Sequence, residues 1–177
     1  MPRKTKYQIL RDYVDYLNDV FNQIITDSRL VILNQKYITC FQNKFPRPLK
    51  LKPRGFLHFH QLVSVRYGKV IVEDCGYRFS LSSNPDDEQQ WVFRYEYSLN
   101  PEENVPHAHL HLNADRSGEQ LQHIHFPTGR VSIEQVIAHL IIEHGIKSKR
   151  DDWLEYLAKS HAGFTKQRTD PQSQLFP

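Results

Sequence analysis

Hydrophobic periodicity divides the chain into a leading helix, a block of strands and closing helices. Between residues 6 and 25, apolar side chains recur every three or four positions, which is the spacing of an amphipathic helix. Residues 29–42 contain a Leu-Val-Ile-Leu run followed by β-branched and aromatic residues. That pattern fits a pair of strands and equally fits an extension of the helix, so both alternatives stay open.

The pattern after Gly55 alternates with period two. It predicts five consecutive strands over residues 57–66, 70–81, 91–99, 107–113 and 121–126. Helical spacing returns at residues 133–141, between Ser132 as N-cap and Gly145 as the stop, and again at residues 151–160. We therefore expect an α+β protein: a five-stranded antiparallel meander with one face packed by the N-terminal helix and the C-terminal helices.

Length and composition indicate one domain with additional segments. The chain has 177 residues, one domain's length. Residues 44–55 hold three prolines and five basic residues without an acid. They predict an extended linker between residues 1–43, the N-terminal helix with its possible hairpin, and residues 56–162, the sheet with the C-terminal helices. The polar residues 163–177 predict a disordered tail.

Hydropathy and charge exclude some classes of protein. The mean hydropathy is −0.62, and no apolar run approaches the roughly 20 residues that cross a bilayer, so we expect no membrane partner. The first residues lead into an amphipathic segment and not into a signal peptide, which predicts a cytoplasmic protein. The net charge of +3 is a weak bias toward polyanions.

Histidine is the unusual residue type. The chain has ten histidines, and five of them lie between His107 and His125. Strand alternation puts these histidines on the face opposite the leucines, together with Arg94 and Glu96. A hairpin centred on Ser117 would set two pairs opposite each other, His111 with His123 and His109 with His125, about 4.5–5.5 Å apart at Cβ.

The first interpretation of this cluster is metal-independent acid–base chemistry on a phosphodiester or phosphate group, without a cofactor. Imidazoles this close cannot all be protonated, so an acid and a base coexist near neutral pH. The expected catalytic residues are His109, His111, His123, His125 and Glu96. The expected phosphate-binding residues are Arg94 and, just before a helix N-terminus, Thr128, Gly129 and Arg130.

Two alternatives stay open for the histidines. The four imidazoles His109, His111, His123 and His125 could instead bind zinc or another divalent metal. They could also be a solvated strand face without function. For residues 128–130 the alternative is a simple strand-to-helix turn.

Other charged and apolar groups are weaker candidates. We expect His139 and His144 to be surface or core residues, and the basic group of Lys147, Lys149 and Arg150 to be a solvated surface or, with residues 44–55, a rim for RNA. The apolar stripe of the N-terminal helix is core or a partner surface, which includes pairing with a second copy as a homo-oligomer.

Residues 57–145 resemble the TumE-like toxin components of bacterial toxin–antitoxin pairs. The resemblance rests on the strand with Arg94 and Glu96, on residues 106–111, on residues 123–130 and on the helix that follows. It implies a small prokaryotic α+β protein held by an antitoxin partner, for which we expect a DNA-binding protein. It also implies growth arrest as the outcome and RNA as the target, as for a ribonuclease. The N-terminal helix and basic segment depart from the family pattern.

Overall fold

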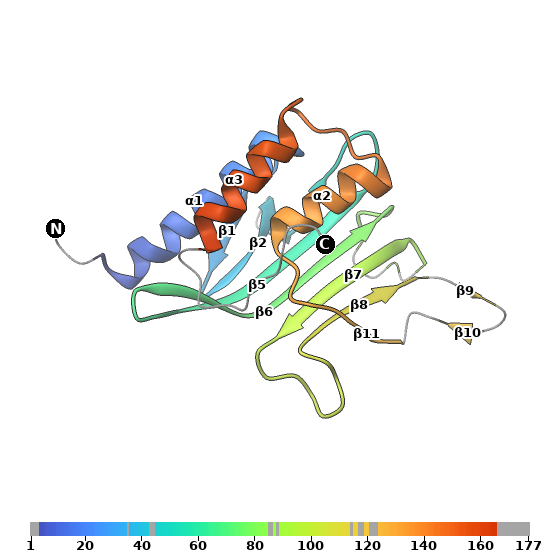
Figure 1. Ribbon diagram of the computed structural model, residues 1–177, viewed down its shortest axis with the longest axis horizontal. Coiled ribbons are helices and arrows are strands. Elements are labelled where there is room, and N and C mark those ends of the chain that lie inside the picture. The colour runs from blue at the N-terminus through green and yellow to red at the C-terminus, as the bar shows by residue number, and fades with distance from the viewer. Residues whose placement is uncertain are drawn as a thin grey trace.

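The computed structural model describes residues 4–34, 36–42, 45–84, 87, 89–113, 115–116, 119–120 and 124–165 (Figure 1). Its helices are α1 (Lys6–Ile24), α2 (Ile133–His144) and α3 (Trp153–Thr165). Its strands are β1 (Leu30–Leu33), β2 (Tyr37–Gln42), β3 (Phe45–Pro46), β4 (Leu49–Lys50), β5 (Phe56–Arg66), β6 (Lys69–Ser80), β7 (Trp91–Ser98), β8 (Ala108–Leu112), β9 (Asp115–Arg116), β10 (Glu119–Gln120) and β11 (Phe126–Pro127). None of the described helices is long and apolar enough to span a membrane.

The main sheet is an antiparallel meander. Its strands follow the order β1-β2-β5-β6-β7-β8-β11, with β3 beside β2 and β4 beside β5. The predicted α+β class and antiparallel sheet are confirmed. The described sheet has nine strands and not five, partly because residues 30–42 adopt the strand alternative and form the β1–β2 hairpin.

The predicted basic linker is wrong where β4 forms. Leu49 pairs with Leu57 of β5, and both Leu49 and Leu51 are completely buried, whereas Lys50 is exposed. Leucines alternate with lysines here, so that one side of the segment enters the core while the cations stay in solvent. The segment is therefore part of the folded domain.

The helix boundaries follow their capping residues. Ser132 accepts a hydrogen bond from the backbone N–H of Gln135, whose side chain bonds back to the cap, and Gly145 ends α2 in the left-handed region at φ 64°. Both were predicted. Helix α3 continues to Thr165, so the first residues of the predicted tail are helical. Residues 166–177 lie outside the described residues.

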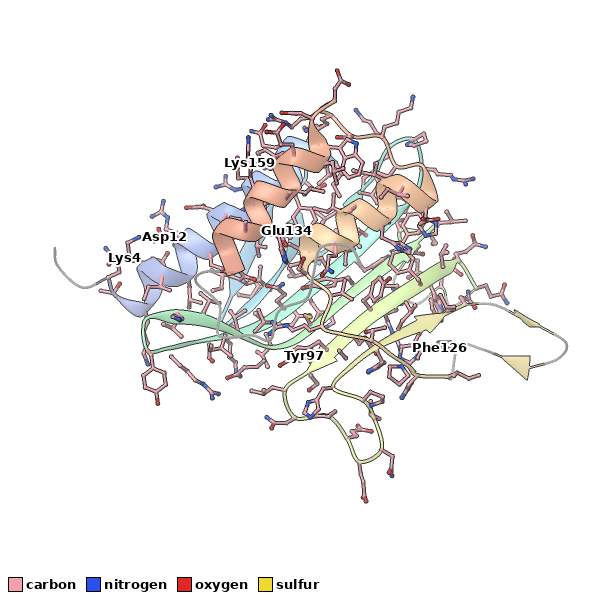
Figure 2. The ribbon with its side chains drawn as sticks, in the orientation of Figure 1. Lys4, Asp12, Tyr97, Phe126, Glu134 and Lys159 are labelled. Atoms are coloured by element: carbon pink, nitrogen blue, oxygen red, sulfur yellow. The ribbon has the colours of Figure 1, made fainter. Side chains whose placement is uncertain are left out.

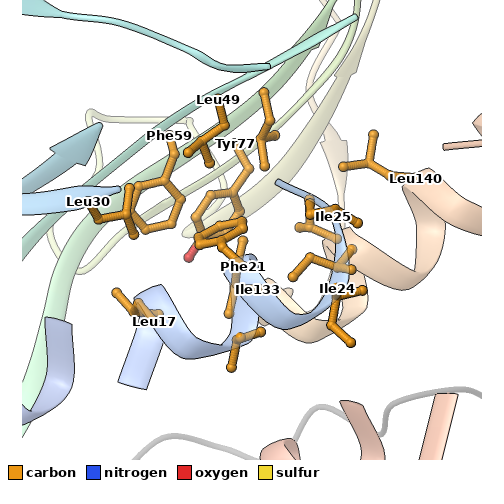
Figure 3. Close-up of a cluster of buried hydrophobic side chains, with 14 of the residues drawn as sticks. Leu17, Phe21, Ile24, Ile25, Leu30, Leu49, Phe59, Tyr77, Ile133 and Leu140 are labelled. Carbon is orange, nitrogen blue, oxygen red and sulfur yellow. The ribbon is translucent and has the colours of Figure 1, made fainter. Parts of the chain in front are cut away.

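One apolar core joins the helices to one face of the sheet. In Figure 3, Leu17, Phe21 and Ile24 of α1 lie close to Phe59 and Tyr77 of the sheet. The rings of Phe21 and Phe59 meet edge to face with centroids 5.5 Å apart. Helix α2 contacts the same face, because the ring centroid of His139 lies 4.8 Å from that of Phe93. The opposite face of the central strands is left for polar side chains.

A buried carboxylate joins the three helices. Glu134 of α2 has no exposed surface, and its Oε1 accepts hydrogen bonds from the hydroxyls of Tyr16 in α1 and Ser160 in α3. Its Oε2 lies 3.7 Å from Nδ1 of His161. Figure 2 shows Glu134 at the start of α2, beside α3.

Candidate functional site

Two adjacent rows of polar residues cross the face of the sheet opposite the helices. The first row runs from β5 to β8 through directly opposed residues, His58, Arg78, Arg94 and His111. The second row runs parallel to it through His60, Gly76, Glu96 and His109. Because alternate residues of a strand project from the same face, both rows belong to one surface.

Glu96 connects the two ends of these rows. Its Oε2 lies 3.2 Å from Nε2 of His109 and 3.1 Å from Nε2 of His111. Its Oε1 forms an ion pair with Nε of Arg94 at 3.0 Å. The carboxylate is therefore held by a cation on one side and faces two imidazoles on the other.

His125 completes the group from the segment just before β11. Its ring centroid lies 4.7 Å from that of His109 and 4.6 Å from that of His111. The ring nitrogens that the three histidines offer lie within 4.8 Å of one another. We call His109, His111, His125 and Glu96 the histidine cluster.

The hydrogen bonds of His109 determine which of its nitrogens carries a proton. Nδ1 lies 2.9 Å from the carbonyl oxygen of Pro106, and a carbonyl only accepts, so Nδ1 is the donor. In the neutral ring, Nε2 then directs a lone pair at the Glu96 carboxylate 3.2 Å away, which is repulsive. A proton or a metal ion between the two atoms would make this contact favourable.

Burial excludes one of the interpretations of the cluster. His109 is 6% exposed and His111 is 3% exposed. The solvated strand face is therefore wrong for these two histidines. Glu96 is 31% exposed at its side chain and His125 is half-buried, so the cluster reaches solvent on one side.

The predicted register of the hairpin is wrong by two residues. Symmetric pairing about Ser117 would set Phe126 opposite Ala108, but Phe126 lies opposite Leu110. The short β9–β10 ladder pairs Arg116 with Glu119, so its centre lies after Ser117. A shift of two keeps every side chain on its face, which is why His125 still meets His109 and His111. His123 lies outside the described residues.

The structure separates the two predicted phosphate-binding groups. Arg94 lies in the first polar row, but the guanidinium carbon of Arg130 lies 4.3 Å from the ring centroid of Tyr97. Tyr97 follows Glu96 in β7 and so projects from the opposite face of the sheet. Thr128 donates its backbone N–H to the carbonyl of Ala108, so residues 128–130 are not brought to Arg94.

A hollow of about 320 Å³ adjoins the histidine cluster on the polar face. Glu96 lines it, together with Arg47, Arg78, Arg94, His58 and His60. Sequence analysis missed this hollow, although His58 and His60 alternate with Leu57 and Phe59 as the other histidines alternate with leucines. Burial, and then the charge of Arg78, lowers the pKa of His58 to about 4, so its ring is neutral at neutral pH.

The weaker candidates lie away from this face. His139 and His144 lie on α2 with their Nε2 atoms 3.3 Å apart, and their rings pack against Phe93. Burial lowers the pKa of both histidines. Two of the predicted RNA-rim cations form ion pairs, Lys149 with Asp27 and Arg150 with Asp152.

Comparison with protein-family models, with curated proteins and with solved structures finds no match to this chain. The resemblance to TumE-like toxins therefore stays a prediction.

Proposed function

We propose that the histidine cluster binds a divalent metal ion of the zinc class and that the protein is a metal-dependent hydrolase. The observation that carries this proposal is the convergence of two imidazole Nε2 atoms on one carboxylate oxygen. His109 and His111 meet Glu96 Oε2 at 3.2 Å and 3.1 Å, and His125 lies against both rings.

The distances from Glu96 Oε2 to the Nε2 atoms of His109 and His111 agree with ligands around one ion. Nitrogen and oxygen ligands lie about 2.0–2.2 Å from zinc, so neighbouring ligand atoms of a tetrahedral site are about 3.3 Å apart. The bond from Nδ1 of His109 to the Pro106 carbonyl is the kind of outer contact that orients a metal-binding imidazole. Arg94 orients Glu96 in the same way.

The position of the cluster favours a catalytic ion over a structural one. The cluster opens on one side to solvent and to the hollow, whose wall includes Glu96. A bound zinc ion with an accessible position lowers the pKa of its water to about 7 and so supplies hydroxide for hydrolysis. The histidines and Glu96 would hold the ion, with the buried His109 and His111 on the side away from solvent.

Metal-independent acid–base chemistry on a phosphate group is the second candidate. The same contacts favour it if one imidazole carries a proton on Nε2 and donates it to Glu96, while a neighbouring imidazole stays unprotonated on one nitrogen and acts as the base. Toxicity, an RNA substrate and a DNA-binding antitoxin remain proposals that rest on the resemblance. A cytoplasmic location and a homo-oligomer remain predictions from the sequence.

Metal analysis of the tag-free protein tests the proposal. We expect one zinc or cobalt ion per chain after dialysis, and a cobalt absorption band typical of histidine ligands. His111→Ala and His125→Ala should abolish both signals. His107→Ala is the matched control, because His107 lies in the same run of sequence but is exposed and bonds to the Ser98 carbonyl.

Two results would count against the metal centre. One is a folded wild-type protein that takes up no ion from micromolar zinc or cobalt. The other is hydrolytic activity that persists unchanged in chelator with no bound ion, which would favour the acid–base candidate.

A further inference from the structure

We propose that the hollow beside the histidine cluster binds the phosphate group of a phosphate ester, which is the substrate of the cluster. This inference rests on the proposed hydrolase function for the reaction, although the binding itself does not depend on a metal. The hollow is lined by three arginines, Arg47, Arg78 and Arg94, and by one carboxylate, Glu96.

Two of these arginines face each other across neighbouring strands, and their like charges repel. Arg78 and Arg94 lie directly opposite each other on β6 and β7, where Cβ atoms are about 4.5–5.5 Å apart and like charges repel. Glu96 forms an ion pair with Arg94, which offsets part of that repulsion. An anion held between the guanidinium groups would offset it further.

Arg47 adds a third cation from another part of the chain. It lies in the segment between β3 and β4, and its side chain is exposed. Among the described residues no carboxylate lies within ion-pair distance of Arg47. It lines the hollow together with the two opposed arginines, so three arginines border one space. Planar guanidinium groups bind phosphate oxygens in pairs of hydrogen bonds.

Aromatic rings form part of the remaining wall. His58 lies opposite Arg78 on the neighbouring strand and lines the hollow. Tyr37 and His60 stack with ring centroids 6.0 Å apart and an angle of 12° between the rings, which gives a flat wall. The volume of about 320 Å³ is at the lower end for small-ligand sites, so the hollow takes a phosphate and its adjoining group but not a larger ligand as a whole.

The hollow and the histidine cluster share Glu96, so a phosphate on Arg78 and Arg94 lies beside the cluster. In hydrolysis, the oxygen of a water molecule forms a bond to phosphorus, and the bond from phosphorus to the ester oxygen breaks. One proton of that water passes to the departing alcohol. The arginines would neutralise the phosphate oxygens during this exchange.

Titration with inorganic phosphate tests the binding site in the full chain, both with zinc and after chelation. We expect saturable binding in both states, with the affinity falling about tenfold or more in Arg78→Gln and in Arg47→Gln. Arg66→Gln is the matched control, since Arg66 also lies on a central strand but pairs with Glu73 at 2.6 Å. It should bind phosphate as the wild type does.

The possible failures are distinguishable. Phosphate binding by a protein that takes up no metal would support this inference and contradict the proposed metal-dependent hydrolase. Equal phosphate affinity in Arg47→Gln, Arg78→Gln and Arg66→Gln would overturn the inference even if the metal site is present. If Arg78→Gln does not fold, the exposed Arg47 decides the test.

Discussion

Gly76 and His60 lie directly opposite each other on β6 and β5, and a Cβ added to Gly76 would lie 2.4 Å from Cε1 of the His60 ring. The imidazole therefore occupies the space that any other residue at position 76 would need. His60 also contacts Asp74 through Nε2 at 3.2 Å, which fixes the ring on this side. A larger residue at position 76 would require the His60 ring to move, and glycine leaves that wall of the hollow open.

Gly76→Ala should displace the His60 ring and destabilise the fold by about 0.5–1.5 kcal/mol, the cost of an off-rotamer side chain, because the partly exposed ring can move. Urea unfolding would measure the change in free energy. The double variant Gly76→Ala with His60→Ala should recover most of the loss, since the clashing ring is then absent. Equal destabilisation by Gly76→Ala with and without His60 would contradict the proposed clash.

The low pKa of His58 predicts a pH dependence of stability. The folded state holds His58 with a pKa of about 4, whereas the unfolded chain has about 6.5, so the unfolded state binds more protons between these values. His58 thus contributes stability that is complete above pH 6.5 and is lost as the pH falls toward 4. The loss should be about 1–3 kcal/mol, because solvent reaches part of the ring.

Unfolding of wild type and His58→Gln at several pH values measures this contribution. The difference between their free energies of unfolding should shift in favour of the variant as the pH falls from 7 to 4.5. A difference that stays constant over that range would show that His58 titrates normally.

Tyr16→Phe should destabilise the three-helix junction. The variant removes a hydroxyl that donates to Glu134, a carboxylate with no exposed surface. A buried polar group that loses a hydrogen bond costs about 1–3 kcal/mol. Thermal or urea unfolding would show the loss, and Tyr7→Phe, at a residue that is 61% exposed, should change stability little.

Phe21→Ala should destabilise the whole domain by about 3–5 kcal/mol, because it leaves a cavity in the core between α1 and the sheet. Ile142→Ala on α2 removes a side chain that is 54% exposed and should change stability by less than about 0.5 kcal/mol. Fluorescence-detected unfolding compares the two. A stable Phe21→Ala protein with intact strands would mean that α1 is a separate appendage.

Local patterns in the sequence predicted most of the elements. The capping box of Ser132 and Gln135 and the stop at Gly145 are determined by residues within one turn of the helix ends, so sequence alone is enough to locate them. The face of each histidine follows from strand alternation, which needs no knowledge of partners. His109, His111 and Glu96 were assigned to one face for this reason.

The residues that face each other on different strands could not be predicted from such local patterns. The sequence between Arg78 and Arg94 does not determine which residues of β6 and β7 pair. Only the register of these two strands brings the two arginines together. Arg47 was assigned to a linker because the prolines and cations around it are typical of one. The two leucines nearby, which are buried, did not by themselves indicate a strand. The offset between β8 and β11 likewise depends on how the turn is built and not on the pattern of either strand.

The contact between Tyr16 and Ser160 joins residues 144 positions apart in the chain. Phe59 and Tyr77, the sheet partners of α1, precede α3 in the chain, whereas the contact with Ser160 requires α3 to be in place. Contacts this distant in sequence close late and slow the folding of a domain. We therefore expect the three-helix junction to be among the last parts of the domain to form, after α1 has packed on the sheet.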